Sequence, residues 1–242
     1  MEKRAYLIES FHKFGYELSE RQIGQFLTYA DLLVEWNEKM NLTAITEFEE
    51  IVWKHFIDSV AVYQSELITD DVFRGHLIDV GTGAGFPGIP LKIIYPNLKI
   101  TLLDSLNKRI SFLQEVVNAC GLTDVELVHG RAEDYGKNPA YREKYDLCVS
   151  RAVANLSTLS EYCIPFIRKG GLFISYKSSD MKEELNHAKK AIAVFGAEVK
   201  MTEQFTIRGS DIPRSLILIK KTGNTPKKYP RKAGTPSKSP IM

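Results

Sequence analysis

The chain has 242 residues, which is long enough for one large α/β domain with an appendage. Hydrophobic residues make up 44% and charged residues 26%, so the composition excludes general disorder. No apolar run is long enough to span a bilayer. The first ten residues, MEKRAYLIES, mix acids with bases and contain no small-residue cleavage site, so we expect neither a membrane span nor a signal peptide.

The three cysteines are Cys120, Cys148 and Cys163. Their number is odd and their spacing is not that of metal ligands. We therefore expect buried thiols in a cytoplasmic protein, and no metal site.

The net charge of +2 hides an asymmetry along the chain. No acid follows Asp211, and the eight bases beyond it leave 24 bases against 30 acids in the rest. A basic segment of this kind is either solvated without a partner or bound to a polyanion. From Gly223 onward the composition is rich in Gly, Pro, Ser, Thr and Lys, which predicts an extended basic tail over residues 223–242.

Residues 1 to about 70 are predicted to form an N-terminal helical region. Ser19 with Gln22, and Thr46 with Glu49, have the spacing of capping boxes at helix starts. Apolar residues then recur at helical spacing after each of them.

From residue 76 the pattern alternates between strands and helices. The candidate strands are HLIDV, KITLLD, VELVHG, YDLCVS and GLFISYK, and a final hairpin is expected from AEVKMTEQFTI and RSLILIKK. This alternation predicts an α/β fold over residues 71–222, with a mostly parallel, doubly wound sheet and an antiparallel edge strand.

The segment LIDVGTGAGFPGIPLKI places a glycine-rich turn between a strand and a helix. Gly81, Gly83 and Gly85 would let a ligand approach the backbone closely, and Phe86 would stack on the ligand or pack under the loop. The same letters satisfy a dinucleotide fingerprint and the looser G-x-G-x-G of proteins that bind S-adenosylmethionine (SAM).

Neighbouring acids favour SAM over a dinucleotide. Asp79, inside the strand, would repel a pyrophosphate by roughly 3 kcal/mol per charge at ~5 Å and an effective dielectric of ~20, but would attract an ammonium or sulfonium. Its alternative role is to cap the glycine turn. Asp104, at the end of the next strand, suits ribose hydroxyls in either case. Ala132 and Glu133, in the segment GRAED, could meet an adenine amine or could simply start a helix.

The atom that accepts the methyl group is narrowed down by excluding the acceptors whose motifs are incomplete here. The partial match NPAY, at 138–141, lacks the second proline of amine methyltransferases, and neither Cys148 nor Cys163 is placed as an attacking thiolate. Lys177 and Asp104 do not complete a ribose-methylating tetrad. Guanine N7 carries a free lone pair, so positioning alone would suffice for its methylation.

Several blocks together resemble the bacterial 16S rRNA guanine-N7 methyltransferases of the RsmG type, also called glucose-inhibited division protein B. They are WNEKMNLTAIT, KHFIDSV, LIDVGTGAGFPGIPLKI, TLLDSLNKRISFL, SRAVANL and YPRKAGTPSK, and the similarity covers nearly the whole chain. The resemblance implies a Rossmann-like SAM-dependent methyltransferase fold, a cytoplasmic location and a guanine in small-subunit rRNA as the target. It also implies that Gly81 and Phe86 line the SAM pocket, with Ala132 and Glu133 at the adenine and Arg151 near the methyl donor.

Basic residues at loops and strand ends are candidates for RNA phosphate contacts, although any one of them could be a solvated surface charge. In the body these are Lys108, Arg109, Arg131, Lys177 and Arg214, and in the tail Lys227, Lys228, Arg231 and Lys232. With Tyr229 available to stack on a base, we expect the tail to be an RNA-docking arm outside the SAM site; the alternative is a structural strap folded back over the active-site edge.

No residue is assigned a catalytic role, and Arg151, His55 and Lys177 are candidates for positioning the substrate. His55 could be a core residue bonded to Ser59 or, with Asn41 and Asp58 nearby, could help shape a guanine pocket. We expect a monomer whose partner is 16S rRNA or the small ribosomal subunit. The alternatives are a SAM-dependent methyltransferase of a small molecule or protein, a nicotinamide-dependent oxidoreductase, and a nonenzymatic RNA-binding protein.

Overall fold

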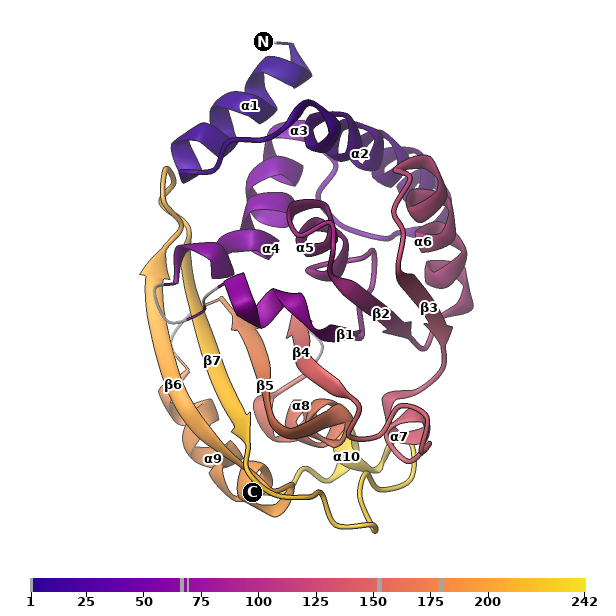
Figure 1. Ribbon diagram of the computed structural model, residues 1–242, viewed down its shortest axis with the longest axis vertical. Helices are drawn as coiled ribbons and strands as arrows, with labels where there is room; N and C mark the ends of the chain where they lie inside the picture. The colour runs from indigo at the N-terminus through magenta and orange to yellow at the C-terminus, as the bar shows by residue number, and fades with distance from the viewer. Residues whose placement is uncertain (1, 66–67, 69, 152–153, 179–180) are drawn as a thin grey trace.

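The computed structural model describes residues 2–65, 68, 70–151, 154–178 and 181–242 (Figure 1). Its N-terminal part is helical: α1 Lys3–Phe14, α2 Glu20–Met40, α3 Phe48–Ile51, the π-helix η1 Val52–Ile57, α4 Asp58–Val60, and the 3-10 helices η2 Ala61–Gln64 and η3 Asp70–Arg74. The helical N-terminal region predicted from the sequence is thus confirmed.

Strands and helices then alternate. The strands are β1 His76–Val80, β2 Lys99–Asp104, β3 Val125–His129, β4 Tyr145–Arg151, β5 Ile167–Lys177, β6 Ala197–Thr206 and β7 Pro213–Lys221. The later helices are α5 Gly88–Ile94, α6 Asn107–Ala119, α7 Ala132–Tyr135, α8 Leu156–Cys163, the 3-10 helix η4 Ile164–Phe166, α9 Lys182–Val194 and α10 Thr235–Lys238.

The strands form one sheet in the order β3-β2-β1-β4-β5-β7-β6. The pairs from β3 to β5 are parallel, whereas β7 runs antiparallel to both β5 and β6. The predicted doubly wound sheet with a final antiparallel hairpin at its edge is confirmed, but the antiparallel strand, β7, lies one place inside the edge strand, β6. The chain reverses its direction along the sheet between β1 and β4, so the open edge above β1 and β4 is where such sheets bind ligands.

Alternation along the strands divides the core between the two faces of the sheet. Leu77 and Leu147 pack with the N-terminal helices, α5 and α6, while Ile78 and Cys148 pack with α8 and α9. Figure 1 shows α1 to α6 gathered in its upper half and α8, α9 and α10 in its lower half. The N-terminal helices therefore share a core with the sheet.

Only one of the two predicted capping boxes forms. Ser19 and Gln22 cap α2 reciprocally. The prediction for Thr46 and Glu49 is wrong, because α3 has Glu47 as its N-cap and no side-chain cap bond. A four-residue helix that continues directly into the π-helix takes its support from the core around Ile51 and Phe56 instead.

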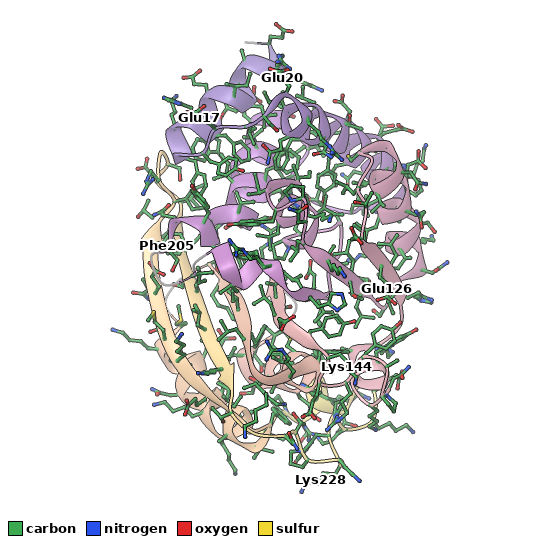
Figure 2. All side chains as sticks on the ribbon, viewed as in Figure 1. Glu17, Glu20, Glu126, Lys144, Phe205 and Lys228 are labelled. Carbon is green, nitrogen blue, oxygen red and sulfur yellow. The ribbon has the colours of Figure 1, made fainter. Side chains whose placement is uncertain are left out.

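The C-terminal segment, residues 223–242, is mostly irregular, and it packs against the body of the protein. Thr225, Pro230 and Pro236 are buried, and Tyr229 packs edge-on against Phe195. The guanidinium of Arg142 donates to the carbonyls of Thr225 and Tyr229, at 2.6 and 2.8 Å. Exposed lysines remain at its surface, and Figure 2 shows Lys228 at the lower end of the molecule.

Within the described ranges, no helix has the length and apolar character that a membrane crossing requires. The same residues contain no group of three or more His, Cys, Asp or Glu side chains able to hold a metal ion.

Candidate active site

An open cavity of about 500 Å³ lies at the carboxyl ends of β1, β2, β3 and β4. Its wall includes Gly81, Gly83 and Phe86 from the glycine loop, together with Asp104 and Arg151. We call it the cofactor cavity. Its place, above the point where the sheet order reverses, is the usual ligand site of doubly wound sheets.

The three glycines of the loop have different tasks, although all have positive φ angles of 72°, 62° and 98° at Gly81, Gly83 and Gly85. A Cβ at Gly83 would point into nearly empty space, with its nearest neighbour 4.0 Å away. A Cβ at Gly85 would lie 2.7 Å from the side chains of Ile89 and Tyr29. Gly83 therefore keeps the cavity open, whereas Gly85 allows the loop to pack against α2 and α5 and does not line the cavity.

Asp79 lies beneath the loop and not on the cavity wall. Its Oδ2 accepts hydrogen bonds from the hydroxyl of Thr82 at 2.8 Å and from the N–H of Gly88 at 2.9 Å. Its Oδ1 has no partner among the described atoms, and burial raises the pKa of the carboxyl to about 7. The structure supports the capping role. Asp79 does not line the cavity, so its carboxylate has no direct contact with the place where a bound cation was expected.

Asp104 is placed as expected, at the lip of the cavity. Its Oδ2 accepts from the N–H of Gly83 at 2.9 Å, and its Oδ1 accepts from the N–H of Leu106 at the same distance. Arg109 approaches Oδ2 at 3.3 Å. The carboxylate is fixed by its neighbours while facing the cavity, as a ligand for vicinal hydroxyls requires.

Ala132 and Glu133 begin α7 and also line the cavity. Glu133 is 4% exposed, and its Oε1 accepts a hydrogen bond of 2.8 Å from the N–H of Gly234 in the C-terminal segment. This bond corrects the expectation that the tail is separate from the site. One wall of the cofactor cavity is held by a residue about a hundred positions further along the chain.

On the other side of the cavity, His55, Phe86 and Arg151 form a stack. The ring centroids of His55 and Phe86 are 4.4 Å apart at 15°, and the Arg151 guanidinium lies 5.1 Å from the Phe86 centroid. Burial, with the nearby Arg151 charge, lowers the pKa of His55 to about 3, so the ring is neutral at physiological pH. A neutral ring avoids adding a second cation to this wall.

The ring nitrogens of His55 define its tautomer. Nδ1 lies 3.4 Å from Arg151, which can only donate, so the proton is assigned to Nε2, 2.8 Å from the hydroxyl of Thr43. The expected side-chain bond to Ser59 is not formed; the Ser59 hydroxyl donates to the backbone carbonyl of His55.

Arg151 is held by Asp58, which the sequence indicated only as a neighbour of His55 and not as its ion-pair partner. Asp58 is 4% exposed and accepts from Arg151 at 2.8 Å and from Arg214 at 2.6 Å. Lys177 lies nearby and donates to Glu184 at 2.6 Å. Arg214 and Lys177 are therefore half-buried and ion-paired, and their contact with RNA stays a prediction. The motif SRAVANL continues into residues 152–153, outside the described residues.

The remaining RNA candidates divide in two. Arg231 is ion-paired: its guanidinium donates to both carboxylate oxygens of Glu161, which is 1% exposed. Arg131 lines the cofactor cavity, and the exposed lysines remain predicted RNA contacts: Lys108, Lys227, Lys228 and Lys232.

Sequence reasoning also missed Thr43 and Tyr162 on the cavity wall and Glu161 beneath the tail. Thr43 lies in the block WNEKMNLTAIT, so the family pattern was a usable signal for it. No local pattern marks Glu161, because its partner is 70 residues away.

A family model described as GidB, rRNA small subunit methyltransferase G, matches residues 22–212. The protein named Ribosomal RNA small subunit methyltransferase G of Alkaliphilus metalliredigens is 53% identical over 241 residues, covering 100% of both chains. The protein of that name from Lactococcus lactis is 50% identical and covers 97% of both chains.

Solved structures share the fold at low identity. A Galdieria sulphuraria protein, named provisionally as a sarcosine dimethylglycine methyltransferase, superposes with a TM-score of 0.53 at 13% identity, covering 73% of this chain and 88% of that one. A provisionally named RNA methyltransferase of Pyrococcus horikoshii gives 0.51 at 11%, covering 69% and 84%. The sheet is thus the Rossmann-like sheet of SAM-dependent methyltransferases, and the chain belongs to the GidB family, that of rRNA small subunit methyltransferase G.

Proposed function

We propose that the protein transfers a methyl group from SAM to N7 of a guanine in 16S rRNA, as a cytoplasmic monomer. The observation that carries the proposal is the pairing of Gly83 with Asp104 at the lip of the cofactor cavity. At the family's glycine motif, the space left by the missing side chain of Gly83 lies beside the carboxylate of Asp104, which is held in place by hydrogen bonds.

The described residues fit SAM. The space above Gly83 would receive the ligand, the carboxylate of Asp104 would hold the ribose hydroxyls, and α7 would flank the adenine. Phosphate ligands prefer backbone N–H groups that are free to donate. Here the N–H of Gly83 is already bonded to Asp104, and an anionic lip would repel a pyrophosphate.

When bound, SAM supplies an electrophilic methyl group on a sulfonium. The protein then needs no general base, because guanine N7 already has a free lone pair and no proton to lose. Its residues position the base, exclude water and balance charge. Asp58 offsets the charge of Arg151, and His55 stays neutral, so the cavity wall does not oppose the cationic donor.

The acceptor chemistry needs no thiolate. Cys148 and Cys163 are 0% exposed, and burial raises the pKa of Cys148. We therefore expect Cys148→Ser and Cys163→Ser proteins that fold to retain methyl transfer. Loss of transfer in a folded variant would instead indicate covalent catalysis by a thiolate.

The proposal is tested by nucleoside mass spectrometry of small-subunit rRNA from a strain that lacks this gene. We expect 7-methylguanosine to fall, and to return on expression of the wild-type chain but not of Gly83→Val. Unchanged 7-methylguanosine in the deletion strain would contradict the proposal.

A further inference from the structure

A second open cavity, of about 580 Å³, lies directly beside the cofactor cavity. The two share His55 and Arg151 as a common wall. In-line transfer requires the donor and acceptor atoms to approach within ~3–3.5 Å, so an acceptor group must enter from a space that adjoins the donor. This cavity has the required position, and we call it the acceptor cavity.

The acceptor cavity is lined by more cations than anions. Arg151, Arg214 and Lys177 converge on it, with side chains 14%, 20% and 15% exposed. Their carboxylate partners on the lining are Asp58, shared by the two arginines, and Glu184, paired with Lys177. Each of the three cations also donates to one backbone carbonyl, that of Lys54, Ala154 or Pro213. Guanidinium groups with five N–H donors and an ammonium with three still keep donors for acceptors that a ligand supplies.

Guanine offers such acceptors on the edge that carries the nucleophile. Its N7 and O6 are both acceptors, whereas adenine presents N7 beside an N6 amine, which is a donor. Cationic donors on the cavity wall therefore attract guanine O6. Toward adenine they would face the N6 amine, which is also a donor, so no hydrogen bond can form. Enzymes that modify a base commonly take it out of its stack into a pocket of this kind.

We propose that the acceptor cavity binds the guanine base, with Lys177 and Arg214 donating to O6. This inference rests on the proposed methyl transfer. N7 is then left unbonded and directed across the His55–Arg151 wall into the cofactor cavity. Lys177 and Arg214 become residues that determine specificity for guanine, in place of the phosphate contacts expected from their charge.

The step balances without another reactant. The lone pair of N7 forms the new N–C bond while the S–C bond breaks, and the electron pair of that bond stays on sulfur. The base gains the positive charge that the sulfonium loses, and no proton moves. Asp58 and Glu184 keep carboxylates close to the base as this charge develops on it.

The test measures binding of nucleotides to the full chain, without methyl transfer. Ligand-observed NMR titrations would compare GMP with AMP, which share the phosphate and differ at the base. We expect the wild type to prefer GMP. Lys177→Met and Arg214→Gln should each weaken GMP binding by roughly tenfold, the effect of one charge-assisted hydrogen bond, and leave AMP binding nearly unchanged.

Lys189→Met is the matched control, since Lys189 lies on the exposed face of α9. S-adenosylhomocysteine binding measured on the same samples reports the fold and the cofactor cavity. Variants that bind it normally but keep the full GMP preference would overturn the inference, as would equal weakening of GMP and AMP, which indicates phosphate contacts. A wild type that prefers GMP but binds no S-adenosylhomocysteine supports the acceptor cavity and contradicts the proposed cofactor.

Discussion

The glycine loop, residues 81–87, and the C-terminal segment, residues 223–242, are both rich in glycine and proline, yet only the first behaves as its sequence predicts. The loop follows a buried strand, so its place in the fold is set by the residues next to it. The segment has no apolar run of its own, and its composition predicts an extended tail. Instead it packs on α7, α8 and Phe195 through partners distant in sequence.

The difference between the two segments shows that composition reports whether a segment can form a core by itself, and not whether it packs on the rest of the protein. A segment with few apolar residues cannot build a core alone, but it can be held by a body that offers buried acceptors. Glu161 and Glu133 are such acceptors, and each is met by a group from the segment, Arg231 or the N–H of Gly234. The segment is a structural strap that reaches the wall of the cofactor cavity.

Removing the strap should have the largest effect. Truncation after Thr222 would leave the nearly inaccessible carboxylate of Glu161 without a cation and would expose the apolar surface under Tyr229. We expect severe loss of thermal stability, with S-adenosylhomocysteine affinity lowered in whatever protein remains folded. Calorimetric unfolding of both lengths measures this. A truncated protein as stable as the full chain would restore the docking-arm interpretation.

A single substitution sharpens the same comparison. Arg231→Gln removes the charge that pairs with Glu161 and should cost about 3–5 kcal/mol of unfolding free energy, the usual effect of leaving a buried charge unpaired. Lys227→Gln, at an exposed position four residues earlier, is the matched control and should cost almost nothing. Urea denaturation of the two variants compares them, and equal costs would show that the ion pair does not hold the strap.

Within the glycine loop, Gly83→Val should abolish S-adenosylhomocysteine binding while destabilising the fold by only about 1–2 kcal/mol, the cost of a side chain at a left-handed φ. Gly85→Ala should do the reverse, losing stability through contact with Tyr29 and Ile89. Calorimetric binding and thermal unfolding of both variants separate the two roles. Intact binding by Gly83→Val would place the ligand elsewhere.

The last expected effect, on the pH dependence of stability, is confined to acid pH. The folded pKa of His55, about 3, lies below its ordinary 6.5, so the unfolded chain takes up this proton more readily. The stability that His55 contributes is complete above pH 6.5 and is lost as the pH falls toward 3. Replacing it by Gln should flatten the acid limb of the stability curve.

Asp79 acts in the opposite sense. Its folded pKa of about 7 lies above the ordinary 3.8, so its contribution declines as the pH rises between these values, and Asp79→Asn should steepen the acid limb. Urea unfolding across this range reports both slopes. Parallel curves for the wild type and both variants would contradict the burial assigned to these groups.

The sheet, its final antiparallel hairpin and the glycine loop were predictable because each follows from a local pattern, an apolar strand or a turn at a strand end. Asp104 was predictable for the same reason, since the end of β2 fixes its place. The ion pairs of Asp58 and Glu161 and the packing of the tail were not, because they depend on partners 93, 70 and about a hundred residues away. Charge alone also did not reveal the ion pairs of Arg214, Lys177 and Arg231, since a sequence does not show which cations meet a carboxylate inside the fold.

The most direct test of the account is a calorimetric titration of the full chain with S-adenosylhomocysteine and, separately, with NAD. A cavity whose lip joins Gly83 to Asp104 predicts saturable binding of S-adenosylhomocysteine and none of NAD. Binding of NAD without binding of S-adenosylhomocysteine would contradict the assignment of this cavity and the methyl transfer proposed from it.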